Sequence, residues 1–79
     1  MIRFMQFIEM TGKVLAAMLS DDEMQASDLQ TAGVTDDTIV RVNQHGDIEV
    51  RRENEWDVVG GLLGNYEERV KHATGRDWA

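Results

Sequence analysis

Histidine and cysteine are the side chains best suited to bind a metal or to act as nucleophile or proton shuttle, and this chain of 79 residues has two histidines and no cysteine. His45 has no second histidine or cysteine at ligand spacing. His72 is expected near the end of a helix, where the dipole favours a positive imidazole. The chain also lacks Gly-x-Ser-x-Gly, His-Glu-x-x-His and both glycine-rich nucleotide motifs. We therefore expect no catalytic residue, no metal site, no cofactor and no enzyme activity.

The acidic charge limits the partners that this chain can have. Fifteen acidic residues stand against eight basic ones, and the net charge is −7. Residues 20–37 hold carboxylates and no basic residue, but they lack the ligand spacing of an EF-hand loop and predict no calcium site. This charge repels nucleic acid and anionic lipid at long range, so nucleic acid is an unfavourable partner.

The apolar residues predict one small domain, 1–79, that makes no contact with a membrane. The longest apolar run, residues 14–19, is far shorter than the roughly 20 residues that span a bilayer. The lack of cysteine fits a reducing compartment. We therefore expect a cytoplasmic protein.

The amino-terminal segment, 1–19, is interpreted as a long amphipathic helix. Most of its apolar residues share one broad arc of a helical wheel, although Ile2 and Met10 fall on the polar side. Four of the five methionines lie here, and flexible methionine suits adaptable contacts. Either they fill the core, or the helix contacts a second copy or a protein partner. The residues assigned to that contact are Phe4, Met5, Phe7 and Met18.

Ser20 and Glu23 have the spacing of a capping box, which predicts a short acidic helix directly after Ser20. Carboxylates in its first turn would face the positive end of the helix dipole. Asp28 offers a second helix start, and Gly33 is the expected stop. Residues 20–33 are then one broken helix or two short ones.

Residues 38–52 are rich in β-branched side chains and predict a β-hairpin. A three-residue loop, 44–46, places Gly46 where such loops need a left-handed residue. The resulting register pairs Val42 with Ile48, Arg41 with Glu49, Val40 with Val50 and Ile39 with Arg51. One face of the hairpin is then apolar and the other polar. A four-residue loop would lose this match, so the sequence itself sets the register.

Residues 54–75 predict a second amphipathic helix, with Asn54 as its N-cap and Gly75 as its stop. Three glycines lie inside it, on the polar side of the wheel and away from the chain's own core. These are Gly60, Gly61 and Gly64. Each costs a helix about 0.8–1 kcal/mol relative to alanine.

The glycines leave alternative interpretations open. In the first, Trp56–Val59 is a third strand, the glycine pair is a turn and the helix begins near Leu62. In the second, the three glycines form a bare patch that another backbone approaches closely. Gly60 and Gly64 have the spacing known for close helix contacts, which adds both residues to the partner-binding set. In the third, the cost is simply tolerated.

One further pattern extends over residues 29–56. It consists of Leu29-Gln30-Thr31-Ala32-Gly33-Val34-Thr35, Thr38-Ile39, Arg41, Gly46-Asp47-Ile48, Val50-Arg51-Arg52 and Trp56. The pattern covers about a third of the chain and resembles the helix-turn-helix-plus-wing run of excisionase-like and other winged DNA-binding domains. The resemblance implies a recognition helix at Thr35–Gln44 and DNA contacts by Arg41, Arg51 and Arg52. Asp36 and Asp37 depart from it, since they would place negative charge at the end of that helix nearest the DNA.

Together these patterns predict an α+β fold: a long N-terminal helix, a short acidic helical region, a β-hairpin and a C-terminal helix, packed as one domain. A two-stranded hairpin is marginal in water unless helices or a second subunit cover it. We interpret the chain as a small acidic protein-interaction or self-association module that binds a protein partner or forms a homodimer. The alternatives are a winged-helix DNA-binding domain and a small enzyme with an unrecognised site.

Overall fold

The structure is a computed structural model that describes residues 7–20 and 22–76. The fold is a small α+β domain with one antiparallel sheet and three short helices. Its elements are β1 (Phe7–Thr11), α1 (Gly12–Met18), α2 (Ala26–Thr31), β2 (Ile39–Asn43), β3 (Asp47–Arg51), β4 (Trp56–Gly61) and α3 (Tyr66–Thr74). None of the helices in the described residues has the length and apolar character needed to cross a membrane.

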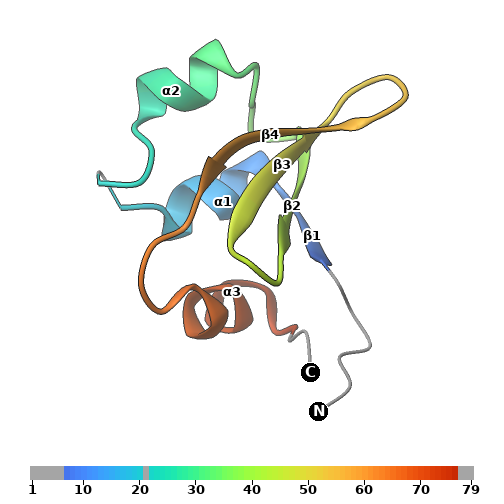
Figure 1. Ribbon diagram of the computed structural model, residues 1–79. Helices are drawn as coiled ribbons and strands as arrows, with labels where there is room; N and C mark the ends of the chain where they lie inside the picture. Colours follow the sequence, from blue (N-terminus) through green and yellow to red (C-terminus); the bar gives the residue numbers. More distant parts are fainter. Residues whose placement is uncertain (1–6, 21, 77–79) are drawn as a thin grey trace.

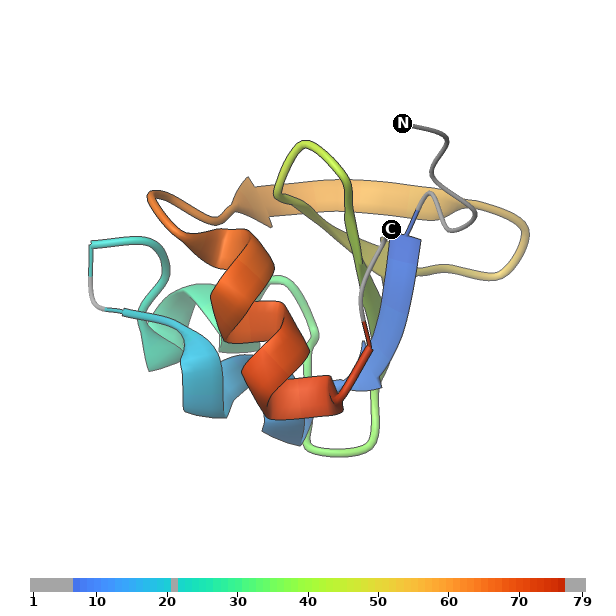
Figure 2. The same ribbon diagram turned by 90° about the horizontal axis from the view of Figure 1, so that it is seen from below.

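The strands cross the sheet in the order β1-β2-β3-β4, and every neighbouring pair is antiparallel. α1 and α2 lie in the connection between β1 and β2, and α3 follows β4. Figures 1 and 2 show that the helices gather on one side of this sheet. The sheet therefore has one covered face and one open face.

The core lies between the sheet and the helices. Side chains alternate along the strands, so every second residue points into this layer. The strands contribute Ile8, Met10, Val40, Val42, Ile48 and Val50. The helices and loops contribute Leu15, Met24, Leu29, Leu62 and Val70.

The predicted β2–β3 hairpin is confirmed, with the predicted loop. Its register pairs Val42 with Ile48, Arg41 with Glu49 and Val40 with Val50. The loop is closed by Asn43, whose Oδ1 accepts hydrogen bonds from the backbone N–H groups of His45 and Asp47 at 2.9 and 3.0 Å. Gly46 has φ +86°, the left-handed conformation that such a loop requires.

The predicted long N-terminal helix is wrong over the described residues. The segment 7–11 is strand β1, and the helix that follows, α1, has only seven residues. Met10 explains the difference, because the strand buries it beside Ile8 on the covered face, whereas a helix would turn it outward. Pairing with β2 decides between the two periodicities.

The predicted helix over 54–75 is also wrong in its first half. Strand β4 forms there, as the alternative with a strand at Trp56–Val59 predicted. This strand continues through both Gly60 and Gly61, where that alternative placed a turn, and the helix begins only at Tyr66. Gly60 does make room for the core, since a Cβ at this position would lie 2.7 Å from Met24 Sδ. Gly64, with φ +72°, forms the turn before α3.

The acidic region contains one short helix. The predicted contact at its start forms, because the Ser20 N–H donates to Glu23 Oε1 at 2.9 Å, but a turn follows instead of a helix. α2 begins after Gln25, whose N–H donates to Asp28 Oδ2 at 2.9 Å. The chain leaves α2 through Gly33, which has φ +78°.

The recognition helix implied by the winged-helix resemblance does not form. Residues 39–43 are strand β2, which pairs with β1 on one side and β3 on the other. Isoleucine and valine favour this strand conformation.

Gly12 starts α1 where the chain passes close to the α2–β2 connection. Its N–H donates to Thr38 O at 2.8 Å, and a Cβ would lie 2.0 Å from Thr35 O.

We expect Gly12→Ala to lower the free energy of unfolding by about 2 kcal/mol or more, since the backbone must shift to make room for the methyl group. Urea unfolding followed by circular dichroism measures this. Gly61→Ala is the control, because its Cβ would meet no atom nearer than 3.8 Å, and an equal loss there would contradict the close approach.

Candidate functional site

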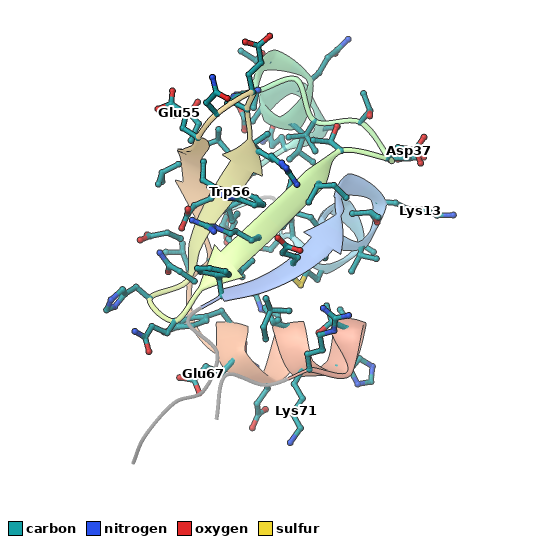
Figure 3. The ribbon with its side chains drawn as sticks, turned by 90° about the vertical axis from the view of Figure 1, so that its right-hand side faces the viewer. Lys13, Asp37, Glu55, Trp56, Glu67 and Lys71 are labelled. Carbon is teal, nitrogen blue, oxygen red and sulfur yellow. The ribbon has the colours of Figure 1, made fainter. Side chains whose placement is uncertain are left out.

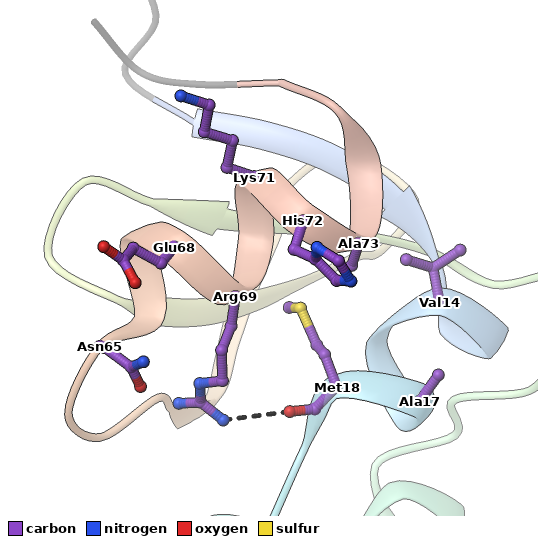
Figure 4. A pocket seen from close by; sticks show the side chains of 9 residues that line it. All are labelled: Val14, Ala17, Met18, Asn65, Glu68, Arg69, Lys71, His72 and Ala73. Carbon is purple, nitrogen blue, oxygen red and sulfur yellow. Dashed lines mark hydrogen bonds between the residues drawn. The ribbon is translucent and has the colours of Figure 1, made fainter.

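Two surfaces are candidates for function, and the first is a groove between α1 and α3 (Figure 4). Residues from both helices and from the loop before α3 line it: Val14, Ala17, Met18, Asn65, Glu68, Arg69, Lys71, His72 and Ala73. The α1 side is apolar, and the α3 side carries most of the polar groups. Within the described residues, no group of three or more histidine, aspartate or glutamate side chains is placed to hold a metal ion.

Arg69 spans one end of this groove and binds Glu23. One guanidinium nitrogen donates to Glu23 Oε1 at 2.7 Å and to Met18 O at 3.0 Å. The other donates to Glu23 Oε2 and to Leu63 O. Glu23 also accepts hydrogen bonds from Ser20 and from the Leu63 N–H, and its side chain is only 1% exposed. This ion pair joins the end of α1, the following turn and the loop before α3, which is a structural role.

The Arg69 guanidinium lowers the pKa of Glu23 from its ordinary value of 4.5 to about 2. Burial of the carboxylate opposes this effect, and the hydrogen bonds from Ser20 and Leu63 add to it. The carboxylate in turn raises the pKa of Arg69. Both groups are therefore charged in the folded protein at neutral pH.

The second candidate is the open face of the sheet, which the helices leave uncovered (Figure 3). We define the open face by the strand residues that point away from the core. These are Phe7, Glu9, Thr11, Ile39, Arg41, Asn43, Asp47, Glu49, Arg51, Trp56 and Val58. Figure 3 shows this face toward the viewer, with Trp56 lying over the strands.

Arg41 holds the centre of the open face. Its guanidinium carbon lies 3.9 Å from the ring centroid of Phe7 and 4.1 Å from that of Trp56. Its Nε and Nη2 donate to Glu49 Oε1 at 3.0 and 2.8 Å, and Asn43 Nδ2 donates to Glu49 Oε2 at 3.3 Å. The Arg41 and Glu49 side chains are only 16% and 12% exposed. Cation–π contacts and charge-assisted hydrogen bonds thus fix side chains from all four strands.

Large apolar side chains are also exposed on the open face. Phe7, Ile39 and Val58 are 38%, 39% and 58% exposed, and they account for all but one of the large exposed apolar side chains in the described residues. The other is Leu63, in the loop before α3. The three lie at separate points of this face, since Phe7 pairs with Asn43, Ile39 with Thr11 and Val58 with Glu49.

A polar hollow adjoins the open face beside the β3–β4 turn, with Glu9 of β1 among its lining residues. Its lining consists of Glu9, Arg51, Arg52, Glu53, Asn54, Glu55 and Trp56. The hollow thus places carboxylates and an indole ring side by side. Such a combination suits a cationic side chain.

The structure does not bring the predicted partner-binding residues together. Phe4 and Met5 lie outside the described residues. Phe7 is on the open face, Met18 lines the groove, Gly60 packs against Met24 and Gly64 forms a turn.

The sequence reasoning missed Trp56, Ile39 and Val58 as surface residues of one face. It did pair Arg41 with Glu49, but it did not place aromatic rings on either side of the guanidinium. The signal that was available is the period-two alternation of apolar and polar side chains in residues 8–11, which predicts a strand.

Comparison of the chain with protein-family models, with curated proteins and with solved structures found no match. A function for this protein therefore rests on the chemistry of the groove and of the open face.

The ion pair at Glu23 predicts a loss of stability in acid. Because its pKa is about 2 in the folded protein and 4.5 when exposed, its contribution is complete above pH 4.5 and is lost as the pH falls towards 2. We expect a loss of up to about 3 kcal/mol in the free energy of unfolding across this window, measured by chemical denaturation at a series of pH values. Glu23→Gln should lack this part of the pH dependence, and exposed Glu68→Gln should keep it. Parallel profiles for wild type and Glu23→Gln would contradict the assignment.

The position of Arg41 gives a second stability prediction. Arg41→Ala leaves Glu49 poorly paired and removes both ring contacts, so we expect a loss of about 2 kcal/mol or more in the free energy of unfolding. Arg41→Lys should recover little of it, since an ammonium cannot stack flat between two rings while donating two hydrogen bonds to one carboxylate. Arg51→Ala, at an exposed arginine on the neighbouring strand, should stay within about 0.5 kcal/mol of wild type. Similar losses in the two alanine variants, by thermal and urea unfolding, would refute the central role of Arg41.

Proposed function

We propose that this protein is a non-catalytic interaction module that binds a protein partner through the open face of its sheet. The observation that carries the proposal is the exposure of Phe7, Ile39 and Val58 on the same face as Arg41, whose guanidinium lies over the rings of Phe7 and Trp56. Aromatic side chains and arginine are the residue types enriched at the centres of protein interfaces.

The rigidity of the open face supports this role. Arg41, Glu49 and Asn43 are held by hydrogen bonds, and the Arg41 guanidinium lies over the rings of Phe7 and Trp56. A partner that binds a preformed surface avoids much of the entropy cost of ordering side chains. The groove between α1 and α3 is a weaker candidate, because its Arg69 already serves the ion pair with Glu23.

DNA binding by a winged helix is not part of the proposal. The segment assigned to its recognition helix is strand β2, and the open face that carries Arg41 and Arg51 also carries Glu9, Asp47 and Glu49. Phosphates are bound by clustered basic residues that are not neutralised in this way.

A photo-crosslinking amino acid at Val58 tests the proposal in cells of the source organism. We expect it to form an adduct with another protein, whereas the same amino acid at Gln30, an exposed position on α2, should form none. Phe7→Ser should weaken the Val58 adduct, because it removes an aromatic side chain from the same face and one of the two rings that hold Arg41. Equal labelling from both positions would contradict binding through this face. An adduct of twice 9.0 kDa would assign the face to a second copy instead of a separate partner.

A further inference from the structure

Three carboxylates line the polar hollow beside Trp56. Glu9 comes from β1, and Glu53 and Glu55 come from the β3–β4 turn. None of them has a hydrogen-bond or ion-pair partner among residues 7–20 and 22–76. Figure 3 shows Glu55 at the border of the open face, on the same side of the sheet as Trp56.

The arginines around the hollow offset the charge of these three carboxylates only in part. Arg41 is bound to Glu49, and Arg52 turns to the other side, where it donates to Ala32 O and Asp57. Arg51 is the one arginine of this region that forms no such contact among the described residues. The local balance is therefore negative, in a chain whose net charge is −7.

The open face already demonstrates the chemistry that fits this hollow. The guanidinium of Arg41 is stacked on Trp56 and held by a carboxylate of the neighbouring strand. A second cation placed in the hollow would meet the same two kinds of group, an indole ring and carboxylates. Cation–π attraction and charge-assisted hydrogen bonds act together in such a site.

We infer that the open face takes a basic, partly apolar segment of a protein partner. An arginine or lysine of that segment lies against Trp56 among Glu9, Glu53 and Glu55, and its apolar neighbours cover Phe7 and Val58. This inference rests on the proposed function and names the chemistry of the partner.

A second copy of the chain fits this surface less well than a basic segment does. Two copies would bring their carboxylates and their net charges of −7 together, which is repulsive.

Phage display against the full chain identifies the preferred sequences directly. The probe is a random library of 12-residue peptides, and we expect recovered peptides to be enriched in arginine and lysine next to aromatic or aliphatic residues. Synthetic copies are then measured by fluorescence anisotropy at 20 and 500 mM NaCl. We expect binding to weaken at the higher salt concentration, since exposed charge pairs are screened.

A matched pair of triple variants separates the hollow from the net charge. Glu9→Gln with Glu53→Gln and Glu55→Gln should weaken binding of the recovered peptides about tenfold at 20 mM NaCl. Asp36→Asn with Asp37→Asn and Glu68→Gln removes the same charge from other exposed positions and should change binding less than about twofold. Circular dichroism checks that both variants keep the fold. Equal weakening by the two variants would overturn the inference.

Val58→Ser distinguishes failure of this inference from failure of the proposed function. If the recovered peptides are neutral or acidic but lose binding in Val58→Ser, the open face binds proteins and the basic-segment inference is wrong. If Val58→Ser leaves binding unchanged, both fail. Recovery of no peptide with micromolar affinity would overturn the inference. A dimer in sedimentation equilibrium that Val58→Ser dissociates would also overturn it, by assigning the face to a second copy.

Discussion

The ion pair between Glu23 and Arg69 holds together the layer that covers the sheet. The three helices have seven, six and nine residues, and helices of this length are not stable alone in water. They depend on packing through Leu15, Leu29 and Val70, and on polar contacts between chain segments far apart in sequence, of which this ion pair is one. The Glu23 side chain is only 1% exposed, and a buried carboxylate without a positively charged partner would strongly destabilise the fold.

The three short helices cover one face of the four-stranded sheet and leave the other face open. The other face must be compatible with water and still keep its side chains in order, and the stack of Phe7, Arg41 and Trp56 meets both needs. The rings shield the guanidinium from solvent, and Glu49 balances its charge. The open face thus has the aromatic and arginine content of a protein interface, and its central side chains are held in fixed positions. For these two reasons we propose that the function lies on this face.

The β-hairpin could be predicted because all the information for it is local. Alternation of Val40, Val42, Ile48 and Val50, together with Gly46 in the loop, allows only one register. The segment 7–11 is different, since so short a run fits a helix as well as a strand, and only its distant partner β2 decides. The position of Gly60 likewise has no explanation until Met24 is seen to occupy the space above it.

The candidate site shows the same division between local and distant information. The pairing of Arg41 with Glu49 follows from the hairpin register. The rings on either side of that guanidinium come from β1 and β4, the two outer strands, whose places in the sheet depend on contacts between segments far apart in the chain. Sequence patterns identified the side chains and their types but did not show that these would meet.

The order of the strands also has a consequence for how this protein acquires its shape. β2, β3 and β4 are joined by short turns, so they find one another at little entropic cost. β1 pairs with β2, for example through Thr11 and Ile39, and this pairing closes a longer loop that contains both α1 and α2. We expect this longer loop to close later than the short turns do. The strand that leaves the ribosome first is thus expected to take its place last, and until it does, Arg41 is stacked on one side only.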